Sequence, residues 1–304
     1  MTIEGVSSVA APRRIRLGMV GGGRGAFIGG VHRMAARLDD RYELVAGALS
    51  SDAARAAASA AELHIAPQRS YADYADMARR EAAREDGIDV VAIVTPNHLH
   101  GRIASAFLDA GIDVICDKPM TTTLAEALAL VAKVRDTQRL FALTHNYSGY
   151  PMVRQAREMV AAGELGELRV IQAEYPQDWL STDLEATGQK QASWRVDPVQ
   201  AGAGGSLGDI GSHAEHLARF ISGLELAQVS ADLKTFIPAA GSTTTAMCCC
   251  ATRTARAACS GRARSLPATR MRCACVSTAA RPVLRSRRSI PTSSGSRRWA
   301  AGRS

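Results

Sequence analysis

The feature of this 304-residue sequence that most limits its possible folds is a glycine-rich run close to the N-terminus. An apolar strand pattern, Ile15–Val20, leads into Gly21-Gly22-Gly23-Arg24-Gly25-Ala26, and apolar residues at helical spacing follow to Leu38. Gly21 permits a tight turn, Gly23 lets the backbone approach a diphosphate, and Ala26 lets the helix pack close to the strand. The strand–turn–helix context favours a dinucleotide diphosphate site over a merely flexible turn. The expected contacts are Gly21, Gly23, Arg24, Gly25 and Ala26.

Short apolar runs alternate with helical segments over the first 150 residues, as in βαβ units with a parallel sheet. Strands are predicted at residues 15–20, 43–49, 90–94, 113–116 and 140–143. Helices are predicted at residues 26–38, 51–63, 71–84, 99–110 and 124–136. Right-handed crossovers would place these helices on both faces of the sheet. The predicted fold class is therefore α/β, with a doubly wound Rossmann sheet.

The residues after the second predicted strand bear on which dinucleotide binds. An NAD enzyme usually has Asp or Glu there to hold the ribose 2′-hydroxyl. In this chain the position falls near Ser50 and Ser51, with Arg55 one helical turn further on. Hydroxyl groups and a guanidinium suit a 2′-phosphate, so the pattern favours NADP over NAD. In the alternative, Asp52 reaches back to the ribose and Arg55 faces solvent.

Two further motifs follow predicted strands of the same sheet. Thr95-Pro96-Asn97-His98-Leu99-His100 comes after strand 90–94, and Asp117-Lys118-Pro119 comes after strand 113–116. Ligands of open α/β sheets bind beyond the carboxyl ends of the strands, which is where both motifs fall. Lys118 is a candidate proton donor or orienting cation, rather than a solvated surface charge. The residues expected to contact the cofactor here are Thr95, Pro96, Asn97, His100, Asp117, Lys118 and Pro119.

A second glycine-rich segment, residues 204–213, carries a carboxylate and an imidazole. Asp209 and His213 are four residues apart, a spacing that puts both on one face of a helix. An Asp beside a His can orient the ring and favour its protonated form. The pair is therefore a candidate for proton transfer, with a simple helix cap by Asp209 as the alternative.

Together, Gly21-x-Gly23, Thr95-Pro96-Asn97-x-x-His100, Asp117-Lys118-Pro119 and Asp209-x3-His213 resemble the glucose–fructose oxidoreductase and inositol dehydrogenase family, Gfo/Idh/MocA. The resemblance, over residues 13–237, implies hydride transfer between a nicotinamide, NADP or NAD, and a hydroxyl or carbonyl carbon of a sugar or cyclitol. It implies that Lys118, Asp209 and His213 surround the reacting carbon, with His213 taking the hydroxyl proton. A regulator that binds NADP without turnover is the alternative.

The resemblance also implies a domain plan. A flexible leader (residues 1–12) precedes the NAD(P)-binding domain (13–146), and a partial substrate and oligomerisation α/β domain (147–240) follows. That second domain would have an open, mostly antiparallel sheet and would form homo-oligomers. Its pocket would include Asn146 and Tyr147, with Trp194 and Arg195 from the loop over residues 176–206. Core packing is the alternative for Trp194. No metal site is expected.

Composition excludes several other classes. No apolar stretch reaches the roughly 18–20 residues that a membrane-spanning helix needs, and Met1–Arg14 has no apolar signal core. A cytoplasmic protein without membrane or nucleic-acid partners is expected. The net charge of +8 arises at the C-terminus, because residues 241–304 hold 13 Arg and no Lys, Asp or Glu, whereas residues 1–240 are net −5.

Residues 241–304 differ in character from the rest of the chain. They contain six of the seven cysteines and few large apolar residues, so they are expected to be disordered or irregular. A nucleic-acid-binding arm is the first alternative, but residues 241–304 show no pattern of aromatic residues interleaved with the arginines for base stacking. A zinc site would need another cysteine spacing, and a disulfide cluster would need an oxidising compartment. The sequence instead suggests a frameshift in a GC-rich gene, which would leave the second sheet incomplete and activity and solubility poor.

The frameshift hypothesis predicts a single-base difference in the source gene between about codons 236 and 247. Shifting the reading frame by two bases at Met247-Cys248-Cys249-Cys250 gives Val-Leu-Leu for every choice of codons, and Val-Leu-Leu is strand-forming. Resequencing the gene tests the hypothesis, and an unchanged reading frame through this interval would reject it.

Overall fold

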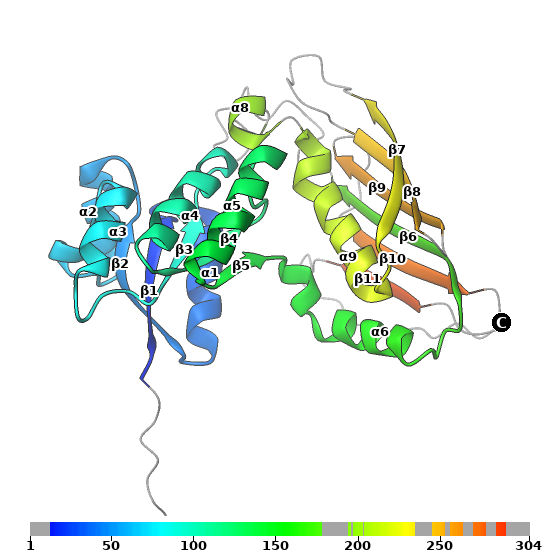
Figure 1. Ribbon diagram of the computed structural model, residues 1–304, viewed down its shortest axis with the longest axis horizontal. Helices are drawn as coiled ribbons and strands as arrows, with labels where there is room; N and C mark the ends of the chain where they lie inside the picture. The colour runs from blue at the N-terminus through cyan, green and yellow to red at the C-terminus, as the bar shows by residue number, and fades with distance from the viewer. Residues whose placement is uncertain are drawn as a thin grey trace, which may run out of the picture. The chain divides into compact units, whose positions relative to one another are not determined.

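The computed structural model describes residues 13–177, 194–195, 197–202, 204–234, 245–252, 256–263, 270–277 and 284–289. The chain forms two compact units (Figure 1). The first consists of Met1–Thr95, Leu99–Met120 and Ala125–Leu143. The second consists of Pro96–His98, Thr121–Leu124 and Thr144–Ser304. The expected leader, residues 1–12, lies outside the described residues.

A five-stranded sheet with the order β2-β1-β3-β4-β5 forms the centre of the first unit. Its strands are β1 (Ile15–Gly21), β2 (Tyr42–Ala48), β3 (Val90–Val94), β4 (Asp113–Asp117) and β5 (Phe141–Thr144). β1 pairs in parallel with β2 on one side and β3 on the other, so the strand order reverses at β1. Crevices for ligands form at such a switch point. The predicted doubly wound sheet is confirmed.

Helices cover both faces of this sheet, because its strands are apolar on both sides. They are α1 (Phe27–Leu38), α2 (Ala53–Glu62), α3 (Tyr74–Ala82), α4 (His100–Asp109) and α5 (Leu124–Thr137). One core joins α3, α4 and α5 to the sheet through residues such as Met77, Phe107 and Leu130. The other joins α1 and α2 to the opposite face through Ile28 and Ala60.

A buried ion pair fixes the segment that crosses from α2 to α3. The carboxylate of Glu81, 1% exposed, accepts hydrogen bonds from Arg69 Nε at 3.1 Å and from the Tyr71 hydroxyl at 2.8 Å. The Tyr71 backbone N–H donates to Gly47 O at 2.9 Å, which attaches the segment to β2. Burial, together with Glu81, raises the pKa of Tyr71 to about 12. The carboxylate therefore satisfies two buried donors on a segment whose only regular structure among the described residues is a short 3-10 helix, Pro67–Arg69.

The second unit is a six-stranded sheet with the order β11-β10-β6-β9-β8-β7. The strands are β6 (Leu168–Gln177), β7 (Leu226–Lys234), β8 (Thr245–Thr252), β9 (Arg256–Ala263), β10 (Arg270–Ser277) and β11 (Leu284–Ser289). Among the described strands of this sheet, β6 and β9 pair in parallel and the other four pairings are antiparallel, so the expected mostly antiparallel sheet is confirmed. α6 (Pro151–Ala161) and α9 (Ser212–Ser222) pack on one face around Ile171, Tyr175 and Leu217.

The expectation of irregular structure throughout residues 241–304 is wrong for four segments. β8, β9, β10 and β11 are strands of the second sheet, with a register shift between Val276 and Ser277 of β10, and β9 and β10 flank β6 on its two sides. Composition reflects how much apolar surface side chains can bury, whereas strand pairing satisfies backbone N–H and C=O groups whatever the side chains are. The rest of residues 241–304 lies outside the described residues.

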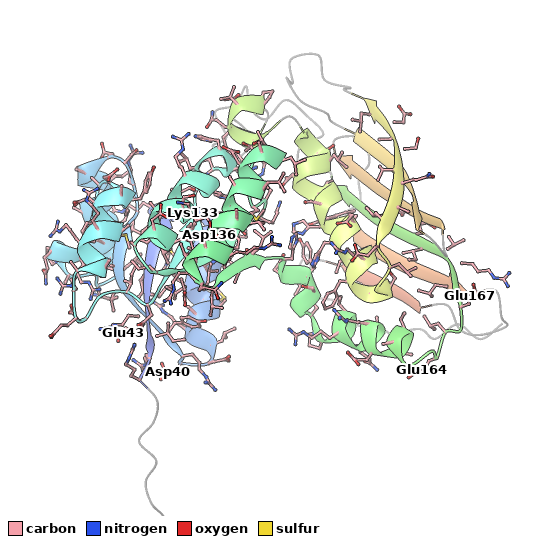
Figure 2. The ribbon with its side chains drawn as sticks, viewed as in Figure 1. Asp40, Glu43, Lys133, Asp136, Glu164 and Glu167 are labelled. Carbon is pink, nitrogen blue, oxygen red and sulfur yellow. The ribbon has the colours of Figure 1, made fainter. Side chains whose placement is uncertain are left out.

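Exposed acidic side chains lie on both units. Asp40, Glu43 and Asp136 are exposed on the first unit, and Glu164 and Glu167 on the second (Figure 2). Within the described residues, no helix is long and apolar enough to cross a bilayer.

Replacing Glu81 with Ala is expected to destabilise the first unit by about 3–5 kcal/mol, because the buried Arg69 would lose its buried carboxylate partner and keep only the exposed Asp86, 3.8 Å away. Urea denaturation followed by circular dichroism measures the loss. The matched control is Glu85→Ala, an exposed position, which should change stability by less than about 0.5 kcal/mol. Equal midpoints for the two variants would contradict the role given to Glu81.

Candidate active site

The glycine-rich turn has the conformation that only glycine adopts easily. Gly21, Gly22 and Gly25 have φ angles of +81°, +73° and +73°. A Cβ atom on Gly23 would lie 2.7 Å from Leu49 O, whereas one on Gly25 would meet nothing within 4 Å. The turn therefore packs tightly against β2 on one side and is open at Gly25.

The closest contact between helix and turn occurs at Gly29. A Cβ atom there would lie 2.4 Å from Gly22 Cα, nearer than any side chain allows. The sequence analysis gave the close-packing role to Ala26. In the structure Ala26 precedes α1, and its N–H donates to Gly23 O at 3.0 Å. The signal that could have identified Gly29 is a glycine one turn into a helix that follows a glycine-rich strand end.

Beside the turn lies a buried hydroxyl without a partner. Thr95 Oγ1 is fully buried and has no hydrogen-bond partner in the described part of the chain. A Cβ atom on Gly21 would lie 3.0 Å from Thr95 Cγ2, so the two motifs adjoin. An open glycine turn, a helix N-terminus and a free buried hydroxyl together fit the diphosphate end of a dinucleotide.

The residues expected to choose between NAD and NADP begin α2. Asp52 caps this helix by accepting the Arg55 N–H at 2.7 Å, and its own N–H donates to Ser50 Oγ at 3.1 Å. The Asp52 carboxylate is thus engaged locally, while Ser51 and Arg55 are exposed. Arg24 of the glycine turn donates from Nε to Glu62 Oε1 at 2.6 Å, and this bond lowers the pKa of Glu62.

One histidine connects the two motifs that follow β3 and β4. His100 is 1% exposed, and its Nδ1 and Nε2 lie 2.7 Å from Pro119 O and 2.9 Å from Thr95 O. The Lys118–Pro119 peptide bond is cis. The Asp117 carboxylate lies 3.9 Å from His32 Nε2. Parallel pairing of β3 with β4 brings these loops to one sheet edge, as the sequence predicted.

The loop residues Pro96–His98 belong to the second unit. There the Asn97 side-chain amide donates to Ala201 O at 3.0 Å, at the end of the short helix α8 (Pro198–Ala201). The carboxylate of Asp197 caps α8, and its pKa is lowered chiefly by the hydrogen bond from Gln200. The Asn97 donor predicted to meet the cofactor is thus directed to a backbone carbonyl.

His213 occupies an aromatic pocket in the second unit. It lies in α9, is 6% exposed, and its ring centroid is 4.6 Å from that of Tyr147 and 6.0 Å from that of Tyr175. The two tyrosine hydroxyl oxygens are 2.7 Å apart, within hydrogen-bonding distance. Tyr147 was predicted to be near the substrate. Tyr175, on β6, was missed because its strand alternation indicates only a core position.

Asp209 lies one turn before His213, in a π-helical turn, Leu207–Gly211, that leads directly into α9. π-turns in helices occur often at functional sites. Asp209 Oδ2 is 3.5 Å from Arg195 Nε, and the Arg195 guanidinium stacks 4.3 Å from the Trp194 ring. Asp209 does not cap α9, since Gly211 occupies that position. Arg195, predicted to bind substrate, therefore also balances the charge of Asp209.

Two more histidines extend the ring contacts of His213: the His145 ring centroid lies 6.3 Å from that of His213. The rings of His145 and His216 stack with centroids 3.9 Å apart. Burial, with the nearby charge of Arg219, lowers the pKa of His216 and favours its neutral form. Asn146 starts a short 3-10 turn, Asn146–Gly149, ahead of α6.

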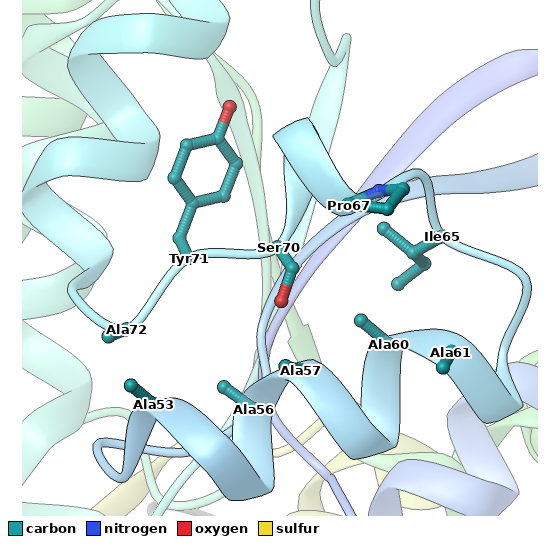
Figure 3. Close-up of a pocket in the computed structure, with 10 residues that line it drawn as sticks. All are labelled: Ala53, Ala56, Ala57, Ala60, Ala61, Ile65, Pro67, Ser70, Tyr71 and Ala72. Atoms are coloured by element: carbon teal, nitrogen blue, oxygen red, sulfur yellow. The ribbon is translucent and has the colours of Figure 1, made fainter.

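A separate hollow of about 280 Å³ lies between α2 and residues 65–72. Figure 3 shows its lining of small side chains, such as Ala53 and Ala57, together with Tyr71. None of the predicted site residues lines it, so it does not belong to the candidate active site.

Residues 15–145 match the family described as "Oxidoreductase family, NAD-binding Rossmann fold", and residues 153–275 match the "GFO/IDH/MocA C-terminal domain". The chain belongs to the Gfo/Idh/MocA family. The second match extends past residue 240, where the composition changes. Membership confirms the predicted family and its NAD(P)-binding domain.

Named relatives support the same assignment. The uncharacterized oxidoreductase YfiI of Bacillus subtilis is 34% identical over 239 residues, 78% of this chain and 60% of YfiI. Levoglucosan dehydrogenase of Pseudarthrobacter phenanthrenivorans is 32% identical over 231 residues, 74% of this chain and 55% of that enzyme. The chain thus spans a little over half the length of these relatives.

A solved structure shows the same fold with a nucleotide bound. The inositol dehydrogenase homolog from Azotobacter vinelandii complexed with NAD+ is 34% identical, with a TM-score of 0.86. The similarity covers 90% of this chain and 70% of that chain. An oxidoreductase from Sinorhizobium meliloti is 45% identical, with a TM-score of 0.79, over 91% of this chain and 72% of that chain.

The close contact at Gly29 predicts that Gly29→Ala displaces α1 and weakens dinucleotide binding by about 10-fold or more. Gly30→Ala is the matched control in the same helix, because its Cβ would have only a side-chain nitrogen at 3.9 Å. Gly30→Ala should bind normally and gain about 0.5–1 kcal/mol of stability from helix propensity. Fluorescence titration with NADH and NADPH measures the affinities, and equal affinities in both variants would contradict the contact's importance.

Proposed function

We propose that this protein is an NAD(P)-dependent oxidoreductase that interconverts a hydroxyl and a carbonyl group on a sugar or cyclitol. The observation that carries the proposal is buried His213 in its tyrosine pocket, one turn after Asp209. A buried imidazole with an adjacent carboxylate is suited to accept and return a proton. Relatives named for levoglucosan and inositol support the substrate class.

The glycine turn and the N-terminus of α1 would hold the diphosphate, with Thr95 Oγ1 as a further hydroxyl beside the turn. When bound, the nicotinamide supplies a hydride acceptor or donor. We place Ser50, Ser51 and Arg55 at the adenosine ribose. Because Arg55 is exposed and Asp52 is engaged as a helix cap, this end suits a 2′-phosphate, and NADP is the preferred cofactor.

His213 would take the substrate hydroxyl proton during oxidation and return it during reduction. Asp209 would stabilise the imidazolium that forms. The Arg195 guanidinium, which pairs with Asp209, would partly offset the negative charge of that carboxylate. Lys118 would donate a hydrogen bond to the same substrate oxygen and stabilise negative charge that develops there. The tyrosine contacts hold the His213 ring, so the proton is received at a fixed place.

Lys118→Ala is expected to lower kcat by about 100-fold or more, since general acid–base and charge-stabilising groups contribute on that scale. Dinucleotide affinity should change much less. Turnover is measured by NAD(P)H absorbance on a panel of sugars and inositols, and affinity by fluorescence titration. Lys133→Ala removes a partly exposed lysine that pairs with Asp109 and should behave like the unmodified chain.

The same panel of sugars and inositols distinguishes an enzyme from a nucleotide-binding regulator. Tight dinucleotide binding by the unmodified chain, with no turnover on any polyol, would indicate a nucleotide-binding regulator and contradict the proposed activity. Failure to bind either dinucleotide would contradict both the proposed oxidoreductase and the nucleotide-binding regulator.

A further inference from the structure

We infer that Arg33 is a positioning residue of the glycine turn and supplies the positive charge that this turn offers to an anionic diphosphate. The inference rests on the proposed function for the identity of the anion. The contacts that carry it lie within the first unit.

Arg33 reaches the glycine turn from the second turn of α1. Its Nη1 donates a hydrogen bond to Gly22 O at 2.8 Å and lies 3.5 Å from Met19 Sδ on β1. Arg33 comes four residues after Gly29, whose close contact with Gly22 brings this face of the helix against the turn. Side chains on a helix lean toward its N-terminus, which is the direction of the turn. The guanidinium therefore holds a backbone carbonyl of the turn itself.

The bond to Gly22 O also determines where an N–H group points. The peptide unit between Gly22 and Gly23 is trans, so its C=O and N–H groups point in opposite directions. A carbonyl oxygen repels a phosphate oxygen, whereas an N–H group attracts it. By holding Gly22 O, Arg33 keeps that oxygen engaged and directs the Gly23 N–H away from itself. The residue thus fixes the orientation of a donor on which a diphosphate site depends.

The charge of Arg33 has no anionic partner among the described residues. Its side chain is half-buried, and the one charged group that acts on its pKa is another cation, Arg37. Burial, followed by Arg37, lowers the pKa of Arg33, as expected for a cation without a neighbouring anion. Because a guanidinium stays protonated in proteins, this charge is left uncompensated in the protein alone.

The arginine inside the glycine motif is engaged differently. The Arg24 backbone N–H donates to Ser59 Oγ at 3.1 Å, and its Nε donates to Glu62 Oε1 at 2.6 Å. Ser59 and Glu62 both lie on α2, so Arg24 is attached to that helix by its backbone and by its side chain. Its charge is already paired with a carboxylate. Of these two arginines, Arg33 is the one whose charge awaits an anion, a role that the motif alone would assign to Arg24.

Affinity measured at two salt concentrations tests the role of the charge. Arg33→Met is expected to weaken binding of both NADPH and NADH by about 10-fold at about 50 mM NaCl, because it removes the positive charge and the bond to Gly22 O. Salt screens the electrostatic part, so the loss should fall to about 3-fold at about 500 mM NaCl. Arg33→Lys keeps the charge and should bind within about 3-fold of the unmodified chain.

The matched control is Arg37→Met, which removes the same formal charge from an exposed position one turn further along α1. It should change either affinity by less than about 2-fold. Unchanged affinity in Arg33→Met would overturn the inference. So would an equal loss at both salt concentrations, or an equal loss in Arg33→Met and Arg33→Lys, because a purely structural role would give those results.

Two further measurements cover the remaining cases. If circular dichroism shows that Arg33→Met does not fold, Arg33→Gln keeps an amide donor and removes the charge, and the same losses are expected. If the unmodified chain binds neither dinucleotide, the proposed function is contradicted, and calorimetric titration with inorganic diphosphate decides the inference. Binding that is about 3-fold or more weaker in the charge-removed variant would support it, whereas equal binding or no binding would overturn it.

Discussion

The contact between Gly22 and Gly29 is the constraint on which the rest of the first unit depends. With no side chain on either residue, the first turns of α1 lie directly against the end of β1. That contact sets where the amide groups of the glycine turn point, and it sets the approach of α1 to the sheet. A larger residue at either position would separate helix from strand and remove both effects at once.

The parallel sheet then determines what surrounds this turn. Because β1 pairs with β3, the end of β3 is the nearest strand end, and Thr95 adjoins Gly21. Because β3 pairs with β4, the Asp117-Lys118-Pro119 motif comes next along the same edge. The order of the strands thus converts motifs that are far apart in sequence into neighbours. This is why the position of a motif after a strand predicts which motifs are neighbours at this edge of the sheet.

Local patterns were enough to predict most elements of the first 150 residues. The strand at residues 90–94 matches the structure residue for residue, since an apolar run acts locally. Contacts that join distant segments were not predictable. Nothing in the sequence around Glu81 indicates that Arg69 and Tyr71 share its carboxylate, and nothing around Tyr175 indicates a contact with Tyr147. The strands after residue 240 are not predictable from apolar side chains, because their backbone pairing does not depend on side-chain burial.

Several residues that the motifs assigned to ligands are engaged with the protein itself. The Asn97 amide is directed to Ala201 O, Arg195 lies beside Asp209, and His100 lies between two carbonyls. A motif can persist in a sequence because its residues hold a ligand or because they hold the backbone that does. The two cases differ in burial. A ring that is 1% exposed with both nitrogens occupied cannot give a hydrogen bond to a cofactor, whereas an exposed arginine such as Arg55 can. Burial and donor count therefore separate ligand contacts from scaffold contacts within one motif, a distinction that spacing alone does not provide.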